Sequence, residues 1–122
     1  MKGNQNMLFI CYPKCTTCVK ARNWLTENKI KFEERNIKEK NPSYDELKEF
    51  YKKSGLPLKR FFNTSGVLYK EMGLKDKLPN MSEEEMLKLL STDGMLVKRP
   101  IAVSGDTVLV GFKESEWEKL KK

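Results

Sequence analysis

The sequence predicts an α/β fold, with a small mixed four-stranded sheet, flanking helices and a central helical insertion at about residues 43–92. A strand–helix–strand pattern opens the chain, and a block of helical patterns fills its middle. Two β-branched runs and a helical pattern close it. A length of 122 residues suits one domain, so residues 1–122 are expected to form a single domain.

The first third of the chain predicts two strands that flank a helix. The apolar run at residues 7–12 suits a buried strand. From Thr16 the apolar spacing becomes that of a helix, with one side occupied by Cys18, Ala21, Arg22 and Leu25. Residues 31–37 alternate in a strand-like way. Strand, helix and strand in this order predict a parallel pair joined by a right-handed crossover.

The middle of the chain predicts helices with clear start signals. Each of the two longest has a Ser followed three positions later by a Glu, which is a capping box. These pairs are Ser43 with Glu46 and Ser82 with Glu85. Gly55 and Gly94 are expected to end the two helices. The stretches at 56–66 and 67–73 predict short helical pieces separated by a turn.

The end of the chain predicts a β-hairpin and a helix. Residues 99–103 and 106–112 are β-branched runs joined by Ser-Gly-Asp. Residues 114–122 form a helical pattern whose Trp117 and Leu120 can face the sheet. The complete order of elements is that of the thioredoxin-like folds with a helical insertion.

Composition limits the environment and the partners. The chain has 24 Lys+Arg against 17 Asp+Glu, a net charge of +7, but the basic residues are spread along it and mixed with acids. This pattern favours a solvated surface, with a specific anionic partner as the alternative, and direct nucleic-acid binding is not expected. No apolar stretch approaches the roughly 20 residues of a membrane helix, and the first ten residues are too polar for a secretory signal. We therefore expect a cytoplasmic protein without membrane contact.

All three cysteines lie within residues 11–18, where a zinc ion, an iron–sulfur cluster or a thiol–disulfide pair could use them. A structural zinc site is almost always closed by four Cys or His ligands, and the chain has three cysteines and no histidine. The C-x3-C-x2-C spacing resembles the cluster motif of the radical S-adenosylmethionine enzymes, but their large α/β barrel does not fit 122 residues. A thiol pair fits best, no metal is expected, and Cys11 is expected to be a buried spectator.

The thiol pair is Cys15 and Cys18. Cys15 is expected just before the first helix, where the amides of Thr16 and Thr17 carry a partial positive charge and Lys14 adds a full one. Both effects lower the pKa of Cys15 and favour its thiolate, which is the nucleophile. A separation of three places Cys18 near enough to close a disulfide and release a bound partner. Cys15 is therefore the predicted nucleophile and Cys18 the predicted resolving thiol.

Pro100 stands at the start of a predicted strand. An X–Pro bond there can be cis, and in thioredoxin-like proteins a cis proline faces the cysteine loop. Arg99 would then project toward Cys15, where its guanidinium could hold a thiolate or an oxyanion.

Four stretches carry a family resemblance, at residues 12–25, 32–37, 67–74 and 97–112. In order and spacing they resemble the bacterial arsenate reductase/Spx family of thioredoxin-fold proteins, over about residues 8–120. The resemblance implies a thiol–disulfide oxidoreductase without a bound cofactor. Its reductant would be glutathione, glutaredoxin or thioredoxin, so the expected partner is a small thiol or a redox protein.

The family has two branches, which imply alternative functions. The glutaredoxin-dependent arsenate reductases use one cysteine, which corresponds to Cys15, and three arginines, of which only Arg99 is matched here. The other two positions fall near Asn63 and Gly111, with Arg60 close to the first. The Spx-type regulators switch through a C-x-x-C pair and bind the RNA polymerase α subunit. Gly55 corresponds to the glycine at that polymerase contact.

Overall fold

The computed structural model describes residues 7–121 and confirms the predicted α/β fold. The described residues divide into two compact units, one made of residues 7–36 with 99–121 and one made of residues 37–98. The predicted insertion at about 43–92 falls inside the second unit. Among the helices of residues 7–121, none has the length and apolar character needed to cross a bilayer.

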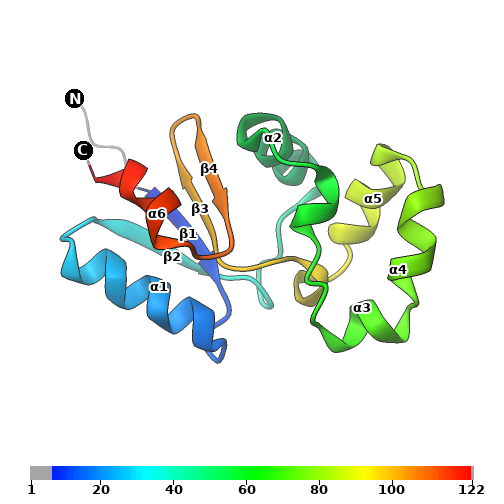
Figure 1. The fold of residues 1–122 in the computed structure, drawn as a ribbon, viewed down its shortest axis with the longest axis horizontal. Coiled ribbons are helices and arrows are strands. Elements are labelled where there is room, and N and C mark those ends of the chain that lie inside the picture. The colour runs from blue at the N-terminus through cyan, green and yellow to red at the C-terminus, as the bar shows by residue number, and fades with distance from the viewer. Residues whose placement is uncertain (1–6, 122) are drawn as a thin grey trace. The chain divides into compact units, whose positions relative to one another are not determined.

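The first unit contains the sheet, whose strand order is β2-β1-β3-β4 (Figure 1). Its elements are β1 (Met7–Cys11), α1 (Thr16–Glu27), β2 (Phe32–Asn36), β3 (Ile101–Ser104), β4 (Thr107–Val110), α6 (Glu114–Trp117) and the 3-10 turn η4 (Glu118–Leu120). Strands β1 and β2 are parallel, whereas β3 pairs antiparallel with both β1 and β4. The predicted crossover unit and hairpin are therefore both present.

One face of this sheet packs against α1 and α6. Phe9 and Cys11 of β1 belong to a buried cluster with Cys18 and Trp24 of α1 and with Trp117. The rings of Trp24 and Trp117 lie 6.2 Å apart, edge to face. Helices α1 and α6 therefore cover the same face of the sheet, and the buried cysteines are part of its core.

Trp117 anchors the C-terminal segment to this core. Its side chain is 0% exposed, and its ring nitrogen donates a hydrogen bond to the carbonyl oxygen of Gly111 at 3.0 Å. Leu120 is partly buried against the same cluster. The prediction that both side chains face the sheet is confirmed.

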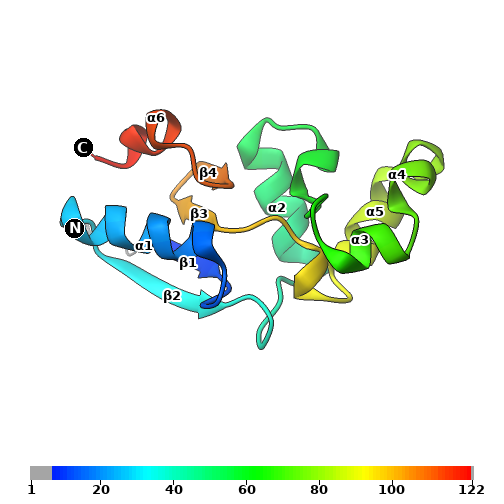
Figure 2. The same ribbon diagram turned by 60° about the horizontal axis from the view of Figure 1, so that its bottom comes forward.

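The second unit is helical (Figure 2). Its elements are α2 (Tyr44–Ser54), η1 (Leu58–Phe61), α3 (Val67–Glu71), α4 (Leu74–Lys77), η2 (Leu78–Asn80), α5 (Glu83–Leu90) and η3 (Gly94–Leu96). Both capping boxes form as predicted, at Ser43 and Ser82. Gly55 follows α2 with a φ of 71°, a left-handed conformation that glycine adopts without strain.

The predicted role of Gly94 is wrong. Helix α5 ends at Leu90 with Ser91 as its C-cap, and Gly94 instead begins the turn η3. A Cβ at Gly94 would lie 1.9 Å from the carbonyl oxygen of Ile37. The glycine is therefore required because another backbone segment passes close to it, which no local pattern indicates.

Candidate active site

The three cysteines lie where β1 ends and α1 begins. Cys11 is the last residue of β1, Cys15 is the N-cap of α1, and Cys18 lies in the first helical turn, as predicted. A tight loop joins the two elements, because the N–H of Cys15 donates to the carbonyl of Tyr12 at 2.9 Å. All three are free thiols; Cys11 and Cys18 are buried, whereas Cys15 is partly exposed. Only Cys15 is therefore open to a partner from solution.

The environment of Cys15 favours its thiolate. Partial burial by itself raises the pKa of Cys15, but the N–H of Cys18, the thiol of Cys18, the N–H of Thr17 and the charge of Arg99 together outweigh it. The pKa of Cys15 consequently lies below its ordinary value. The Cys15 side chain makes no capping hydrogen bond. The amides of Thr17 and Cys18 therefore act on its sulfur as nearby partial positive charges.

The two amides that lower the pKa of Cys15 lie one residue further along the helix than the predicted pair of Thr16 and Thr17. They are those of Thr17 and Cys18, since the side chain of an N-cap residue points at the second and third residues of its helix. Lys14 and Thr16 are exposed. Within residues 7–121, neither Lys14 nor the amide of Thr16 is among the groups that lower the pKa of Cys15.

Cys18 is held as a neutral thiol. Its hydrogen bond to Cys11 and its burial both raise the pKa of Cys18, and the nearby sulfurs of Cys15 and Cys11 add to the effect. The N–H of Tyr12 donates to Cys18 Sγ at 3.3 Å, which opposes the rise without cancelling it. Cys15 and Cys18 are therefore unlike in charge, with the exposed sulfur favouring the thiolate and the buried one keeping its proton.

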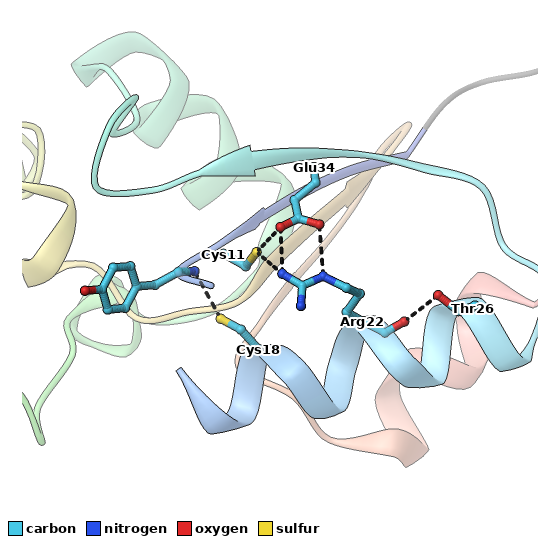
Figure 3. Close-up of polar contacts among 6 residues, drawn as sticks. Cys11, Cys18, Arg22, Thr26 and Glu34 are labelled. Atoms are coloured by element: carbon cyan, nitrogen blue, oxygen red, sulfur yellow. Dashed lines mark hydrogen bonds and ion pairs between the residues drawn. The ribbon is translucent and has the colours of Figure 1, made fainter. Parts of the chain in front are cut away.

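Cys11 contacts an ion pair, as Figure 3 shows. Arg22 of α1 and Glu34 of β2 form a bidentate pair, with Nη2–Oε2 at 2.6 Å and Nε–Oε1 at 3.0 Å. Cys11 Sγ lies 3.4 Å from Glu34 Oε2 and 3.7 Å from Arg22 Nη2. The thiol can thus donate to the carboxylate while its sulfur accepts from the guanidinium.

The ion pair follows from the positions of its residues. Arg22 lies four residues after Cys18, so both point to the same side of α1. Glu34 pairs in register with Phe9, and Phe9 shares its face of β1 with Cys11 because side chains alternate along a strand. The hydrogen bond from Arg22 lowers the pKa of Glu34, so the carboxylate stays ionised beside the buried sulfur.

Arg99 and Pro100 lie directly before β3. The Arg99–Pro100 peptide bond is cis, as the sequence allowed. The guanidinium carbon of Arg99 lies 5.4 Å from the centroid of the Tyr12 ring, a cation–π distance. The charge of Arg99 also contributes to the lowered pKa of Cys15. The carbonyl of Pro100 accepts a hydrogen bond from the N–H of Gly111 at 2.8 Å, which ties the proline to the end of β4.

The site therefore brings together the predicted residues Cys15, Cys18, Thr17 and Arg99, and adds others that the sequence analysis did not assign to it. These are Tyr12, Arg22, Glu34 and Cys11. Two signals could have found the ion pair. Arg22 is a charged residue among the apolar positions on one side of α1, and Glu34 lies two residues after Phe32, on the same side of β2. Across residues 7–121, no group of three Cys, Asp or Glu side chains is placed to hold a metal ion.

Comparison with known proteins adds a family to this geometry. The ArsC family profile matches residues 11–120. The YusI protein of Bacillus subtilis is 54% identical, over 93% of this chain and 97% of its own. Two B. subtilis regulators are each 30% identical: the regulatory protein MgsR over 97% of this chain and 92% of its own, and the global transcriptional regulator Spx over 85% and 78%.

Solved structures have the same fold. An ArsC family related protein from Bacteroides fragilis superposes with a TM-score of 0.94 and 56% identity, covering 96% of this chain and 98% of its own. A protein described as a possible arsenate reductase from Streptococcus mutans superposes with a TM-score of 0.87 and 38% identity, covering 98% and 100%.

Proposed function

The chain belongs to the ArsC family, and on that premise we propose that it is a thiol–disulfide oxidoreductase with Cys15 as nucleophile and Cys18 as resolving thiol. The observation that carries the proposal is the difference between the two sulfurs. Cys15 is partly exposed with a lowered pKa, whereas Cys18 is buried and stays protonated. Stepwise disulfide exchange needs this arrangement, in which a nucleophilic thiolate lies beside a second thiol that stays protonated until the mixed disulfide has formed.

The reaction has two exchange steps. The Cys15 thiolate attacks a disulfide of the substrate, the substrate's S–S bond breaks, and the first product leaves as a thiol after taking up a proton. Cys18 then loses its proton and attacks Cys15 Sγ, which releases the second product thiol and forms the Cys15–Cys18 disulfide. The substrate gains two electrons, and the protein loses them. Glutathione, glutaredoxin or thioredoxin would return the protein to its dithiol state.

The remaining predicted residues have supporting roles in this proposal. Arg99 balances the negative charge on Cys15, a role its contribution to the lowered pKa of Cys15 supports. Lys14 and Thr16, both exposed, would contact the anionic part of a substrate. Thr17 acts through its amide, and Pro100 positions the strand that follows Arg99.

A mixed disulfide trapped on one variant tests the proposal. With oxidised glutathione as the substrate, Cys15→Ser should abolish the release of reduced glutathione. Cys18→Ser should stop after the first step and carry one glutathione on Cys15, seen by intact mass. Val19→Ala changes an exposed side chain of the same helical turn and should keep wild-type turnover. Full activity of Cys15→Ser would overturn the proposal.

A redox-sensing regulator is the second candidate, favoured by the 30% identity to Spx and MgsR. In that case the Cys15–Cys18 disulfide would alter binding to the RNA polymerase α subunit instead of completing a catalytic cycle. Gly55 and Gly73 offer matched variants, because both have a positive φ and a Cβ added at either would meet no other atom of residues 7–121 within 4 Å. If the family contact operates here, Gly55→Asn should weaken capture of the α C-terminal domain, whereas Gly73→Asn should leave it intact. Absence of capture in both redox states would dismiss this candidate.

Arsenate reduction is the third candidate, favoured by 38% identity to the S. mutans protein. Of the three arginines that the family resemblance implies, Arg99 is present, whereas Asn63 and Gly111 stand near the other two positions. Each missing charge-assisted hydrogen bond to an oxyanion removes about 1.5–3 kcal/mol. Turnover with arsenate and glutaredoxin should therefore be weak. The difference in arsenate reduction rate between the wild type and Cys15→Ser would measure it.

A further inference from the structure

Cys11 has surroundings that a spectator thiol does not need. It is 0% exposed at the end of β1, in one buried cluster with Cys18, yet its sulfur contacts the Glu34 carboxylate at 3.4 Å and the Arg22 guanidinium at 3.7 Å. A structural buried cysteine behaves as a small apolar side chain. Here an acceptor for the thiol proton and a cation for the sulfur are both within reach of one buried thiol.

We propose that Cys11 is a third redox-active thiol, which attacks Cys18 in the Cys15–Cys18 disulfide and moves that disulfide into the core. The inference rests on the proposed function, because substrate turnover supplies the Cys15–Cys18 disulfide. Its product is a Cys11–Cys18 disulfide with Cys15 returned as a free thiolate. The oxidised protein would then keep its exposed nucleophile.

The first requirement is that the two buried cysteines are neighbours. Cys18 Sγ lies 3.3 Å from the backbone nitrogen of Tyr12, the residue bonded to Cys11. In Figure 3 the side chains of Cys11 and Cys18 enter the same space between β1 and α1. Both belong to one buried cluster. Cys11 can therefore approach Cys18 without a path through solvent.

The second requirement is removal of the Cys11 proton. The Glu34 carboxylate is ionised and accepts the Cys11 S–H, so it is the base nearest the sulfur. Arg22 lowers the proton affinity of Glu34, but its Nη2 also donates to Cys11 Sγ. The same guanidinium therefore stabilises the thiolate that forms when the proton moves. The negative charge passes from the carboxylate to the sulfur while both groups stay beside one cation.

The third requirement is a preferred direction. In thiol–disulfide exchange the thiol of lower pKa leaves faster, and Cys15 is the sulfur whose thiolate its surroundings favour. A disulfide carries no charge, so it suits the buried positions of Cys11 and Cys18, where a thiolate would be costly. Exchange toward the core places the neutral bond inside and the charged sulfur at the helix entrance.

The step balances without another oxidant. The Cys11 proton passes to Glu34, the Cys11 sulfur bonds to Cys18 Sγ, and the Cys15–Cys18 bond breaks. Its electron pair leaves on Cys15 as the thiolate, and Glu34 later returns its proton to solvent. One disulfide is consumed and one is formed, so the protein neither gains nor loses electrons in this exchange.

Tryptic mapping of the full chain distinguishes the two disulfides. Cleavage after Lys2, Lys14 and Lys20 separates residues 3–14, which hold Cys11, from residues 15–20, which hold Cys15 and Cys18. The wild-type protein is oxidised with one equivalent of oxidised glutathione, sampled over time, quenched in acid and labelled with N-ethylmaleimide. A Cys15–Cys18 bond keeps the 15–20 peptide separate, whereas a Cys11–Cys18 bond links the two peptides and leaves the label on Cys15.

We expect the separate peptide to appear first and the linked pair, labelled on Cys15, to become the major oxidised species. Glu34→Gln should slow the conversion about a hundredfold, the lower end of what a positioned base contributes. Glu33→Gln makes the same charge change at an exposed neighbour on β2 and should keep the wild-type rate. Circular dichroism establishes that both variants are folded, and intact mass verifies each substitution.

The outcomes separate this inference from the proposed function. If the wild-type protein reduces the substrate and the Cys15–Cys18 disulfide persists unlinked to residues 3–14, the inference is wrong and the proposed function stands. A linked pair labelled on Cys18 would show a Cys11–Cys15 bond and overturn the inference as well. Unchanged conversion in Glu34→Gln would remove the assigned base. If no disulfide forms and Cys15→Ser is as active as wild type, both proposals fail.

Discussion

Replacing Trp117 by phenylalanine tests whether its hydrogen bond stabilises the unit that carries the cysteines. The indole nitrogen donates to the carbonyl of Gly111 at 3.0 Å, and the side chain is 0% exposed. Phenylalanine leaves that carbonyl without its partner, which costs about 1–3 kcal/mol. The lost ring volume, about 40 Å³ at ~24 cal/mol per Å³, adds roughly 1 kcal/mol. We therefore expect the free energy of unfolding to fall by about 2–4 kcal/mol.

Trp24→Phe is the matched control, because it removes the same ring volume from the same cluster. The Trp24 side chain is 7% exposed, and within residues 7–121 its ring nitrogen has no hydrogen-bond partner. Urea unfolding followed by the fluorescence of the remaining tryptophan measures both variants, since both tryptophans lie in the first unit. Equal losses in Trp117→Phe and Trp24→Phe would refute the contribution assigned to the hydrogen bond to Gly111.

Two further predictions concern charge at the site. The rate at which iodoacetamide alkylates Cys15 should rise with pH through a midpoint below the ordinary cysteine pKa of about 8.5. Arg99→Gln should move that midpoint upward, because a positive charge that stabilises the thiolate is lost. An unmoved midpoint in the variant would contradict this. Because Arg22 lowers the pKa of Glu34 in the folded protein, the ion pair stabilises it above the ordinary carboxyl pKa of about 4.3, and this contribution is lost as the pH falls through the lowered folded value. Urea unfolding at a series of acidic pH values should therefore show a steeper loss for the wild type than for Glu34→Gln, and parallel curves would argue against the pair.

Much of the fold was predictable because its signals are local. The two capping boxes at Ser43 and Ser82 specify helix starts within four residues of sequence. The turn at Gly105, with a φ of 59°, joins β3 and β4 as the Ser-Gly-Asp sequence predicts. The start of α1 at Thr16 follows from the change of apolar period there. Each of these features depends on neighbours along the chain.

Two other features depend on neighbours in space. Gly94 looks like a helix end in the sequence, but its need for glycine comes from the backbone at Ile37, 57 positions earlier. The burial of Cys11 was predictable, but its contacts with Glu34 of β2 and Arg22 of α1 were not. Neither arrangement leaves a periodic pattern, because each is made by elements that are distant in sequence.

The sequence by itself determined which elements form and that two cysteines, three residues apart, stand at the entrance of a helix. Helix capping, strand alternation and turn chemistry act over a few bonds, so the order of residues encodes them directly. The tertiary structure decided how the three sulfurs differ. Burial, the amides of Thr17 and Cys18 and the charge of Arg99 act through space, and only the folded chain brings them to bear on Cys15 while it keeps Cys18 and Cys11 away from water.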